Sequence, residues 1–402
     1  MPPAVNIDAT TPVLIHVLSL DTVGGVEVLY VNYLADALSR AKAVHFTSVC
    51  GKPPQEIFSK RFASIGHTPF LEEHVWGMRL PRFLSSVVRI RRSLVEGIVN
   101  PNAWVFWNRI ESRPPPGKAI YYEHGGAWNV APTRARREFL ASCERVIANS
   151  EAASVILKKR WGVSQPIRVI PNPLRPDLPV AAAARPALSG PTVRLGCIGR
   201  LVPVKGFEVA IHALSILRGR GIDATLSIAG AGPLERAARA LADRLGVADA
   251  LIWNGRQADV APWYDSIDIL LVPSIREPLG LVALEAAARA VPVIAASVDG
   301  LPEAVLDGRT GICLTPTLSI SEARDVLSDV SSLPNVVVDP VSRQLRAPLI
   351  VDPCAYADAI ELLINDADRY TQYSANAVVH ARNRSDFASY STALSEEFER
   401  SP

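Results

Sequence analysis

The sequence predicts an α/β fold made of two Rossmann-like domains, and three observations support this prediction. Short apolar segments alternate with helix-like patterns along all 402 residues, as in parallel α/β proteins. A chain of this length exceeds what one hydrophobic core usually supports. The alternation stops once, in the Pro- and Ala-rich stretch 176–191, and then begins again. We expect the two domains to face a central cleft, because such sheets bind ligands at the carboxyl ends of their strands.

The first domain is expected at residues 1–175. Its first strand, residues 13–20, is mainly apolar and breaks at Gly24 and Gly25, and the helix 26–40 follows. The other strands predicted in this domain are 44–49, 103–107, 118–122 and 144–148.

The second domain is expected at residues 192–370, after the linker 176–191. The helices at residues 371–402 are expected to cross back to the first domain. Predicted strands alternate with helices in the second domain and occupy residues 193–199, 224–230, 250–255, 268–273 and 292–297.

The composition is that of a globular protein in a reducing compartment. Hydrophobic residues make up 49% and charged residues 20% of the chain, which excludes a disordered protein. The five cysteines lie far apart, without the spacing of a disulfide framework or a zinc site. No apolar run approaches the ~20 residues of a membrane span, and no signal-peptide pattern is present. We therefore expect a soluble, cytoplasmic protein.

Charge is divided unevenly between the two halves. The net charge is only +2, but residues 1–180 carry 22 Lys and Arg against 14 Asp and Glu. Residues 181–402 carry 20 Lys and Arg against 26 Asp and Glu. The halves, at +8 and −6, are expected to face different partners.

Two glutamates, Glu277 and Glu285, enclose the small and apolar residues of REPLGLVALE, directly after the strand 268–273. Pro278 suits the first turn of a helix, which would place Glu277 at its mouth. The carboxylates would then lie roughly 12 Å apart along the axis and about 80° apart around it. N–H groups near Gly280 would offer an anion site. This spacing suits two ends of one ligand, although a buried helix with charged ends has the same pattern.

Two further loops follow predicted strands. Arg200 and Lys205 lie in GRLVPVKGF, where a guanidinium fork and an ammonium suit a diphosphate. A solvated pair on an exposed turn is the alternative. Gly230 and Gly232 lie in AGAGP, which resembles part of a dinucleotide loop and also fits an ordinary tight turn.

These motifs gain specificity from their order along the chain. At the ends of successive strands the sequence has Arg200-x4-Lys205-Gly206, Gly230-x-Gly232-Pro233, Asn254-Gly255 and Glu277-x7-Glu285. The arrangement resembles the C-terminal domain of the family 4 retaining glycosyltransferases, glycosyl transferases group 1, which have the GT-B fold. The resemblance is close over residues 193–314 and looser in the first half.

The resemblance implies a role for each side chain at these strand ends. Arg200 and Lys205 would bind the diphosphate of a nucleotide-sugar donor and stabilise the leaving group. Glu285 would bind the ribose hydroxyls, and Glu277 would contact the donor sugar.

Other donor contacts follow from the same resemblance. Backbone groups around Gly280 and Leu281 would hold sugar and phosphate, and Gly230 and Gly232 would belong to the donor site. Two residues that follow Gly255 would border the base, namely Arg256 and Gln257.

In the first domain, Gly24 and Gly25 look like the glycine loop of the family, where the backbone approaches phosphate and acceptor. A plain strand-to-helix turn is the alternative. His124, in YYEHGG, follows a strand where such enzymes often have a histidine near the transferred sugar, although a lone histidine is more often structural. Ser150, in ANSEAA, is expected to cap a helix.

The sequence departs from the family between Leu314 and Val351, where residues 315–350 look like an insertion beside the donor site. We expect helix within residues 319–333 and a strand at 335–340. The insertion would then be ordered and would border the donor or acceptor site.

The sequence thus predicts a retaining, metal-independent glycosyltransferase of the hexosyltransferase type, with a UDP- or GDP-linked sugar as donor and no cofactor. The expected acceptor is a glycan or lipid-linked glycan of a bacterial cell-surface polysaccharide or lipopolysaccharide. A nucleotide-sugar epimerase of the same fold and an inactive sugar-nucleotide-binding relative are alternatives. A metal-dependent transferase would need Asp-x-Asp after a strand, whereas Asp366-Ala-Asp368 lies in an expected helical region.

A basic segment suggests where the acceptor comes from. RLPRFLSSVVRIRRSL (79–94) has no acidic residue, and its apolar residues follow helical spacing. An ordinary helix packed on a sheet is the alternative. We expect the enzyme to lie peripherally on the inner face of the plasma membrane, held by anionic lipid, and not to bind nucleic acid. The arginines of the segment are Arg79, Arg82, Arg89, Arg91 and Arg92.

Overall fold

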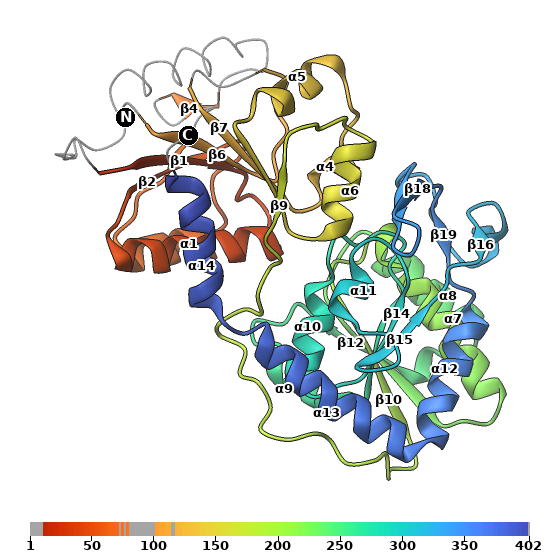
Figure 1. Ribbon diagram of the computed structural model, residues 1–402. Coiled ribbons are helices and arrows are strands. Elements are labelled where there is room, and N and C mark those ends of the chain that lie inside the picture. The colour runs from red at the N-terminus through yellow and green to blue at the C-terminus, as the bar shows by residue number, and fades with distance from the viewer. Residues whose placement is uncertain (1–10, 72–73, 76–77, 80–100, 114–116, 401–402) are drawn as a thin grey trace. The chain divides into compact units, whose positions relative to one another are not determined.

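A computed structural model describes residues 11–71, 74–75, 78–79, 101–113 and 117–400 (Figure 1). The chain divides into two compact units. Unit 1 comprises Met1–Asn149, Ile156–Pro171 and Ala388–Pro402, and unit 2 comprises Ser150–Val155 and Asn172–Phe387.

Unit 1 is built on a parallel sheet with strand order β3-β2-β1-β6-β7-β8-β9. Every residue of β1 is buried, as expected for a parallel strand covered on both faces. All strands predicted for this half are present, together with the helix expected at 26–40. The strands are β1 (Val13–Leu18), β2 (Val44–Val49), β3 (Phe70–Leu71), β6 (Ala103–Trp107), β7 (Ala119–Glu123), β8 (Arg145–Ala148) and β9 (Ile167–Val169), with a small hairpin of β4 (His74–Val75) and β5 (Met78–Arg79).

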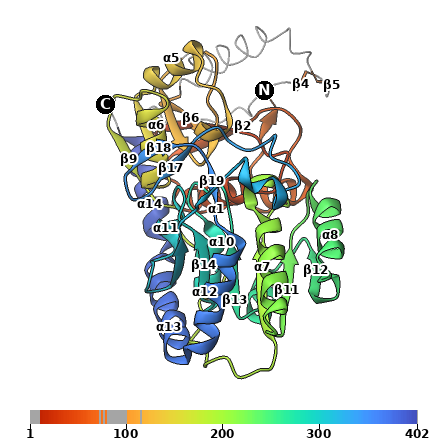
Figure 2. The same ribbon diagram turned by 90° about the vertical axis from the view of Figure 1, so that its right-hand side faces the viewer.

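Helices cover both faces of this sheet (Figure 1 and Figure 2). The Ser150 hydroxyl accepts a hydrogen bond from the Ala153 N–H at 3.0 Å, so the predicted cap of α6 is confirmed. The helices are α1 (Gly25–Arg40), α2 (Glu56–Ser64), α4 (Gly126–Asn129), α5 (Arg134–Ser142) and α6 (Glu151–Lys159).

The last helix, α14 (Phe387–Glu399), packs almost entirely within unit 1. The Tyr390 and Tyr122 hydroxyls lie 3.2 Å apart, and the Arg145 guanidinium donates to the Glu397 carbonyl at 2.7 Å. Phe398 is buried against the rings of His16 and Trp107.

Unit 2 has a second parallel sheet, in the order β12-β11-β10-β13-β14-β15. All five predicted strands are present. Helix α7 packs against α12 and α10 packs against α13, so helices lie on both faces (Figure 2). The strands are β10 (Val193–Ile198), β11 (Ala224–Ala229), β12 (Leu251–Gly255), β13 (Ile269–Val272), β14 (Val293–Ala296) and β15 (Gly311–Leu314). The helices are α7 (Phe207–Gly219), α8 (Glu235–Arg244), α9 (Ala261–Ser266), α10 (Leu281–Ala288), α11 (Leu301–Ala304), α12 (Pro353–Asn365) and α13 (Ala367–Asn383).

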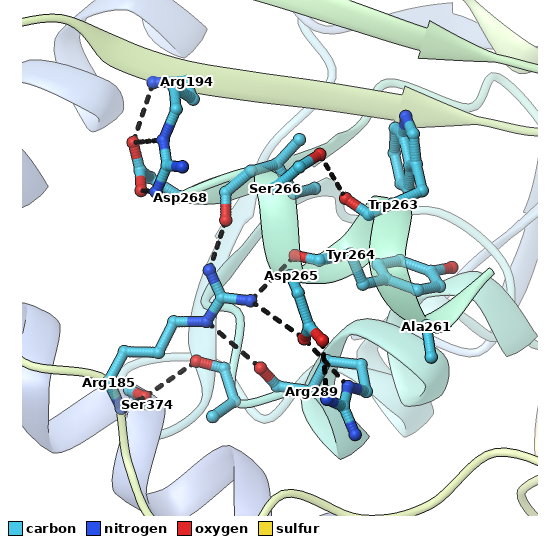
Figure 3. Close-up of polar contacts among 12 residues, drawn as sticks. Arg185, Arg194, Ala261, Trp263, Tyr264, Asp265, Ser266, Asp268, Arg289 and Ser374 are labelled. Carbon is cyan, nitrogen blue, oxygen red and sulfur yellow. Dashed lines mark hydrogen bonds and ion pairs between the residues drawn. The ribbon is translucent and has the colours of Figure 1, made fainter. Parts of the chain in front are cut away.

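The stretch without periodicity, 176–191, lies along unit 2 and is fastened by Arg185 (Figure 3). The Arg185 guanidinium donates to three main-chain carbonyls, those of Tyr264 at 2.7 Å, Arg289 at 3.1 Å and Ile267. The main-chain N–H of Arg185 donates to the Ser374 hydroxyl at 2.7 Å. One side chain thereby satisfies carbonyl groups at the ends of α9 and α10 and fixes the path of the segment.

The insertion 315–350 is ordered, but it contains no α-helix. The strand expected at 335–340 is confirmed as β17 (Val337–Asp339), which forms a hairpin with β18 (Gln344–Arg346). The expected helix is wrong: only a 3₁₀ turn, Glu322–Asp325, follows β16 (Leu318–Ser319), which pairs with β19 (Leu349–Ile350). Acidic side chains bond the local backbone in this stretch: Glu322 accepts from the Ser319 N–H and Asp329 accepts from the Ser331 N–H.

No helix within the described ranges combines the length and the apolar composition that crossing a membrane requires.

Candidate functional site

The loops after β10, β11 and β12 are joined by main-chain hydrogen bonds. The Leu201 N–H donates to the Ala231 carbonyl at 3.1 Å, and the Gly230 N–H donates to the Gly255 carbonyl at 2.6 Å. Gly230 has φ +133°, and a Cβ there would lie 1.8 Å from the Gly199 carbonyl oxygen. Only glycine fits this crossing, and Gly232 continues the same turn. The strand ends therefore form one connected edge of unit 2.

Lys205 and Glu277 meet at this edge. The Lys205 ammonium donates to the Glu277 carboxylate, and the Ser274 hydroxyl approaches the same oxygen at 3.4 Å. The Lys205 side chain is 28% exposed and that of Glu277 is 11% exposed, so the pair is reachable but largely desolvated. Such a pair presents an ammonium to an anion and a carboxylate to a hydroxyl within one short span.

Glu277 does not lie at the mouth of a helix, which corrects the expectation from the sequence. Helix α10 begins at Leu281, and Pro278 lies in the preceding loop. The reason is Gly280, which has φ 92° and caps the helix without a side-chain hydrogen bond. A Cβ on Gly280 would meet Leu301 at 2.5 Å and would lie 3.5 Å from the Glu277 Cγ. The uncapped N–H groups at Leu281 thus start close to Glu277.

Glu285 has different partners. Its carboxylate accepts from the Tyr264 hydroxyl at 2.9 Å, and the same hydroxyl lies 3.1 Å from the Val282 carbonyl oxygen. Burial raises the pKa of Glu285, while the Tyr264 hydrogen bond and the charge of Arg175 lower it. Burial also raises the pKa of Tyr264 well above its usual value, so the phenol stays a donor. Glu285 is thus fixed in orientation, on the first turns of α10.

The remaining donor-side residues predicted from the sequence follow the ends of β10 and β12. Arg200, directly after β10, and Arg256, directly after β12, have exposed side chains. The Gln257 amide donates to the Asn254 carbonyl at 2.7 Å, which closes the turn after β12.

The predicted residues of the first domain belong to unit 1. Gly24 is the N-cap of α1 and Gly25 is its first residue, without a side-chain cap on the helix N-terminus. The Glu27 carboxylate lies 2.7 Å from the position that a Cβ on Gly24 would take. This is a strand-to-helix turn in which the backbone stays open and one acidic side chain lies close.

His124 lies beside β7 in an aromatic environment. Its ring stacks on Trp107, with centroids 5.9 Å apart, and contacts Tyr122 at 4.0 Å. Burial lowers the pKa of His124 to about 3, so the ring is neutral at pH 7. Asn108 accepts from the His124 N–H at 3.0 Å, and the buried Glu123 carboxylate accepts from the Ala127 N–H at 3.0 Å. These contacts hold the loop in one conformation.

Three residues that support this site were not predicted from the sequence: Tyr264, Ser274 and Asp299. Tyr264 orients Glu285, Ser274 approaches Glu277, and Asp299 accepts from the Glu277 N–H at 3.0 Å. Ser274 lies only three residues from Glu277 in the same loop, so proximity gave a signal. The partners of Tyr264 and Asp299 are 21 and 22 residues away, and neither spacing indicates contact.

Among the residues that the structure describes, no group of three or more His, Cys, Asp or Glu side chains is arranged to hold a metal ion.

Two family models match consecutive parts of the chain. The model described as Glycosyltransferase Family 4 matches residues 23–178, and the model described as Glycosyl transferases group 1 matches residues 192–332. The first covers most of the N-terminal half, and the second covers β10–β15 together with the loops described above.

Curated relatives match mainly over part of their length. A D-inositol 3-phosphate glycosyltransferase of Streptomyces bingchenggensis is 33% identical over 44% of this chain and 42% of its own. A GDP-mannose-dependent alpha-(1-6)-phosphatidylinositol monomannoside mannosyltransferase of Mycolicibacterium smegmatis is 35% identical over 36% of this chain and 38% of its own. The chain thus spans less than half the length of these two relatives.

Solved structures match over nearly the whole chain. A glycosyltransferase from Rickettsia africae has a TM-score of 0.70 at 16% identity, covering 97% of this chain and 98% of its own. Anabaena HepE in complex with UDP and glucose has a TM-score of 0.68 at 16% identity, covering 96% of this chain and 99% of its own. WaaG, a glycosyltransferase involved in lipopolysaccharide biosynthesis, has a TM-score of 0.66 at 15% identity, covering 96% of this chain and 100% of its own. These likenesses establish the GT-B fold. The two family models, which match residues 23–178 and 192–332, show that the chain belongs to the family 4 glycosyltransferases.

Proposed function

We propose that this chain transfers a sugar, with retention of anomeric configuration, from a UDP- or GDP-linked donor to a glycan or lipid-linked acceptor. The observation that carries the proposal is the Lys205–Glu277 pair at the connected strand ends of unit 2. In transfer from a nucleotide sugar, negative charge builds on the departing diphosphate. An ammonium already fixed beside a carboxylate can stabilise that charge while the carboxylate holds a sugar hydroxyl.

Each side chain has a step in this proposal. Lys205 and the exposed Arg200 bind the diphosphate and stabilise it as the bond to the sugar breaks. Glu277 accepts from a hydroxyl of the donor sugar, and Glu285, oriented by Tyr264, accepts from the ribose hydroxyls. His124, neutral at pH 7, acts as a hydrogen-bonding group and not as a cation. No cofactor is proposed, because these cations take the place of a metal at the leaving group.

The names of similar proteins support the substrate classes. The Mycolicibacterium relative is named for GDP-mannose and a phosphatidylinositol mannoside, and HepE was solved with UDP and glucose. WaaG is described as acting in lipopolysaccharide biosynthesis. These descriptions favour a UDP or GDP donor and an acceptor in a bacterial surface polysaccharide or lipopolysaccharide.

Thermal unfolding with a panel of UDP-, GDP- and ADP-sugars tests the donor. A donor present at 100 times its Kd should stabilise the protein by about 2.7 kcal/mol. The Glu285→Gln variant is the matched control, since tenfold weaker binding should remove about half of the stabilisation given by the nucleoside diphosphate alone. If none of the sugar nucleotides raises the unfolding temperature of the wild type, the proposed function is wrong.

Donor turnover without acceptor separates this proposal from its alternatives. A transferase should release nucleoside diphosphate slowly by hydrolysis, whereas an inactive relative would bind without turnover. An epimerase would convert the sugar and leave the nucleotide attached to it. Proton NMR of the products distinguishes the three results, because an epimer has the mass of its substrate but different couplings between its ring protons.

We also propose that the enzyme works at the cytoplasmic face of an anionic membrane. The support is the +8 charge of residues 1–180 and the arginines of the segment 79–94. That segment lies outside the described residues, apart from the backbone of Arg79. Each basic residue near an anionic surface contributes about 1 kcal/mol.

Sedimentation with liposomes tests membrane binding. Binding should require anionic lipid, weaken with added salt and fall when Arg89, Arg91 and Arg92 are changed to serine. The control replaces Arg236, Arg239 and Arg244 of α8 by serine, which removes the same charge from unit 2. No binding to anionic liposomes at low salt would favour a soluble acceptor.

A further inference from the structure

The main chain of Glu277 is held from outside its own loop. Glu277 lies in neither a helix nor a strand, so no regular ladder satisfies its polar groups. Its N–H donates to the Asp299 Oδ2 at 3.0 Å, and its carbonyl accepts from the Gly300 N–H at 3.0 Å. Two consecutive residues after β14 therefore fix both polar groups of the Glu277 backbone.

Asp299 is in turn held by the insertion. Its second carboxylate oxygen, Oδ1, accepts from the Val338 N–H at 2.7 Å, and its own N–H donates to the Val338 carbonyl at 3.0 Å. Asp299 and Val338 are each 1% exposed. One buried carboxylate thus joins strand β17 of the insertion to the loop that carries Glu277.

The backbone of Asp299 indicates that this position uses its side chain. Its φ is 47°, in the left-handed region that favours glycine. A glycine would relieve the backbone but would leave two buried N–H groups without their carboxylate partner. Aspartate is among the residues that tolerate this region best, and its carboxylate bonds both N–H groups.

We propose that Asp299 is a positioning residue of the donor site, and that the hairpin β17–β18 of the insertion fixes it there. The inference rests on the proposed function, in which Glu277 contacts the donor sugar. Val338 holds Asp299, Asp299 holds the Glu277 backbone, and the Glu277 carboxylate holds Lys205. Small displacements of such groups lower turnover strongly, because the reacting groups lose their alignment.

Two variants weaken this connection without adding bulk. Asp299→Asn keeps the backbone conformation but directs an NH₂ group at one of the two N–H donors. Val338→Pro removes the N–H that bonds Asp299; because this N–H points to the carboxylate, the pairing of Val338 with Leu345 should tolerate the change. The matched control is Asp339→Asn, the same substitution in the same hairpin, where the carboxylate bonds only the turn and Arg346.

Kinetics give the first readout. With UDP-glucose, or GDP-mannose if only GDP-sugars stabilise the protein, Asp299→Asn should lower kcat by about 10- to 100-fold. KM for the donor and Kd for the nucleoside diphosphate should change by less than about threefold, because Asp299 bonds the main chain of Glu277, whereas Arg200 and Glu285 are proposed to bind the nucleotide. Asp339→Asn should keep the wild-type kcat. An unchanged kcat in Asp299→Asn would overturn the proposal, as would a rise in KM alone.

Amide hydrogen exchange of the full chain without ligand gives a second readout that does not depend on activity. Both Asp299→Asn and Val338→Pro should speed exchange in the segment 274–280, and Asp339→Asn should not. Unchanged exchange there in both variants would also overturn the proposal. Faster exchange in a protein that turns over no sugar nucleotide would uphold the connection and refute the proposed function, so the two failures differ.

Discussion

Titratable side chains at the strand ends of unit 2 bond one another within reach of solvent, whereas those of unit 1 are enclosed by aromatic rings. Lys205 and Glu277 form a partly exposed ion pair, and Arg200, in the loop after β10, is exposed. In unit 1, His16, His45 and His124 are all less than 9% exposed. Residue types that suggest catalysis therefore occur in both units, in opposite surroundings.

The histidines of unit 1 form a chain that fixes their protonation. The Trp107 Nε1–H donates to His16 Nδ1 at 3.1 Å, so His16 carries its proton on Nε2. That nitrogen lies 3.0 Å from His45 Nδ1, which must accept. A proton on His45 Nδ1 would place two N–H groups against each other, and burial already lowers the pKa of His45 to about 4. This cluster stabilises a neutral core.

The partners of each side chain, and not its residue type or its position after a strand, distinguish the two kinds of group. An anion can share Lys205 with Glu277, since both side chains retain exposure. No ligand can replace the partners of His16 without opening the core, because His16 is fully buried among Tyr30, Tyr33 and Trp107.

The cations of unit 2 should give the largest effect. Arg200→Ala and Lys205→Ala should each lower kcat by roughly 10²–10³-fold, because charge develops on the leaving diphosphate. Steady-state release of nucleoside diphosphate measures this. Arg236→Ala, an exposed arginine on α8, is the control and should leave kcat unchanged. Wild-type turnover in both site variants would show that the donor binds elsewhere.

The two glutamates should separate binding from turnover. Glu285→Gln should weaken binding of the nucleoside diphosphate by about 10-fold, since a ribose contact is present before and during reaction. Glu277→Gln should lower kcat by about 10²-fold with little change in that affinity. Calorimetry measures the affinity for nucleoside diphosphate, and donor kinetics measure kcat. Both are carried out on both variants, so that each variant serves as the control for the other. An unchanged affinity in Glu285→Gln would rule out its ribose role.

The fold could be predicted largely from the sequence, because buried parallel strands leave a local record. Each of β1, β13 and β14 is a short apolar run that is buried along its whole length, and burial on both faces requires this composition. The start of α10 could not be placed, since it depends on the left-handed Gly280 and on Leu301, 21 positions away in the chain. The helix expected within 319–333 failed because the Glu322 and Asp329 carboxylates bond nearby main-chain N–H groups and so compete with helical hydrogen bonds.

The residues of the candidate site could also be predicted only in part. Lys205 and Glu277 were predicted as a donor site from their order along the chain, but their direct ion pair depends on loops packed across strands. Asp299 gave no signal, because its partners come from the loop at Glu277 and from the insertion at Val338. Such long-range contacts arise only when the sheet is assembled.

Within unit 2, Arg185 is a largely buried cation that lies outside the candidate site. Arg185→Ala should lower the free energy of unfolding by about 2–3 kcal/mol, because three main-chain carbonyls lose their donor. Arg382→Ala is the control: its exposed guanidinium also bonds carbonyls, of Ala181 and Ala182, and its removal should change stability by less than about 0.5 kcal/mol. Urea unfolding measures both. Equal effects would mean that burial does not set the contribution of such a bond.

The pH dependence of unit 1 should give the smallest effect and tests the neutral core directly. The folded pKa of His45, about 4, lies below its usual 6.5. The neutral ring therefore contributes its full stability above pH 6.5 and loses it as the pH falls from 6.5 to 4, where the unfolded chain binds the proton first. Between pH 7 and pH 5 the free energy of unfolding should therefore fall by about 1–2 kcal/mol through His45.

His45→Gln keeps an acceptor for His16 but cannot titrate, so urea unfolding followed through exchange of β1 amides should show a weaker pH dependence than in the wild type. His212→Gln, at a partly exposed position of unit 2, should leave the pH dependence of β1 unchanged. An equal pH dependence of unfolding in His45→Gln and the wild type would mean that His45 is not held neutral. The proposed contrast between the histidines of unit 1 and the ion pair of unit 2 would then be wrong.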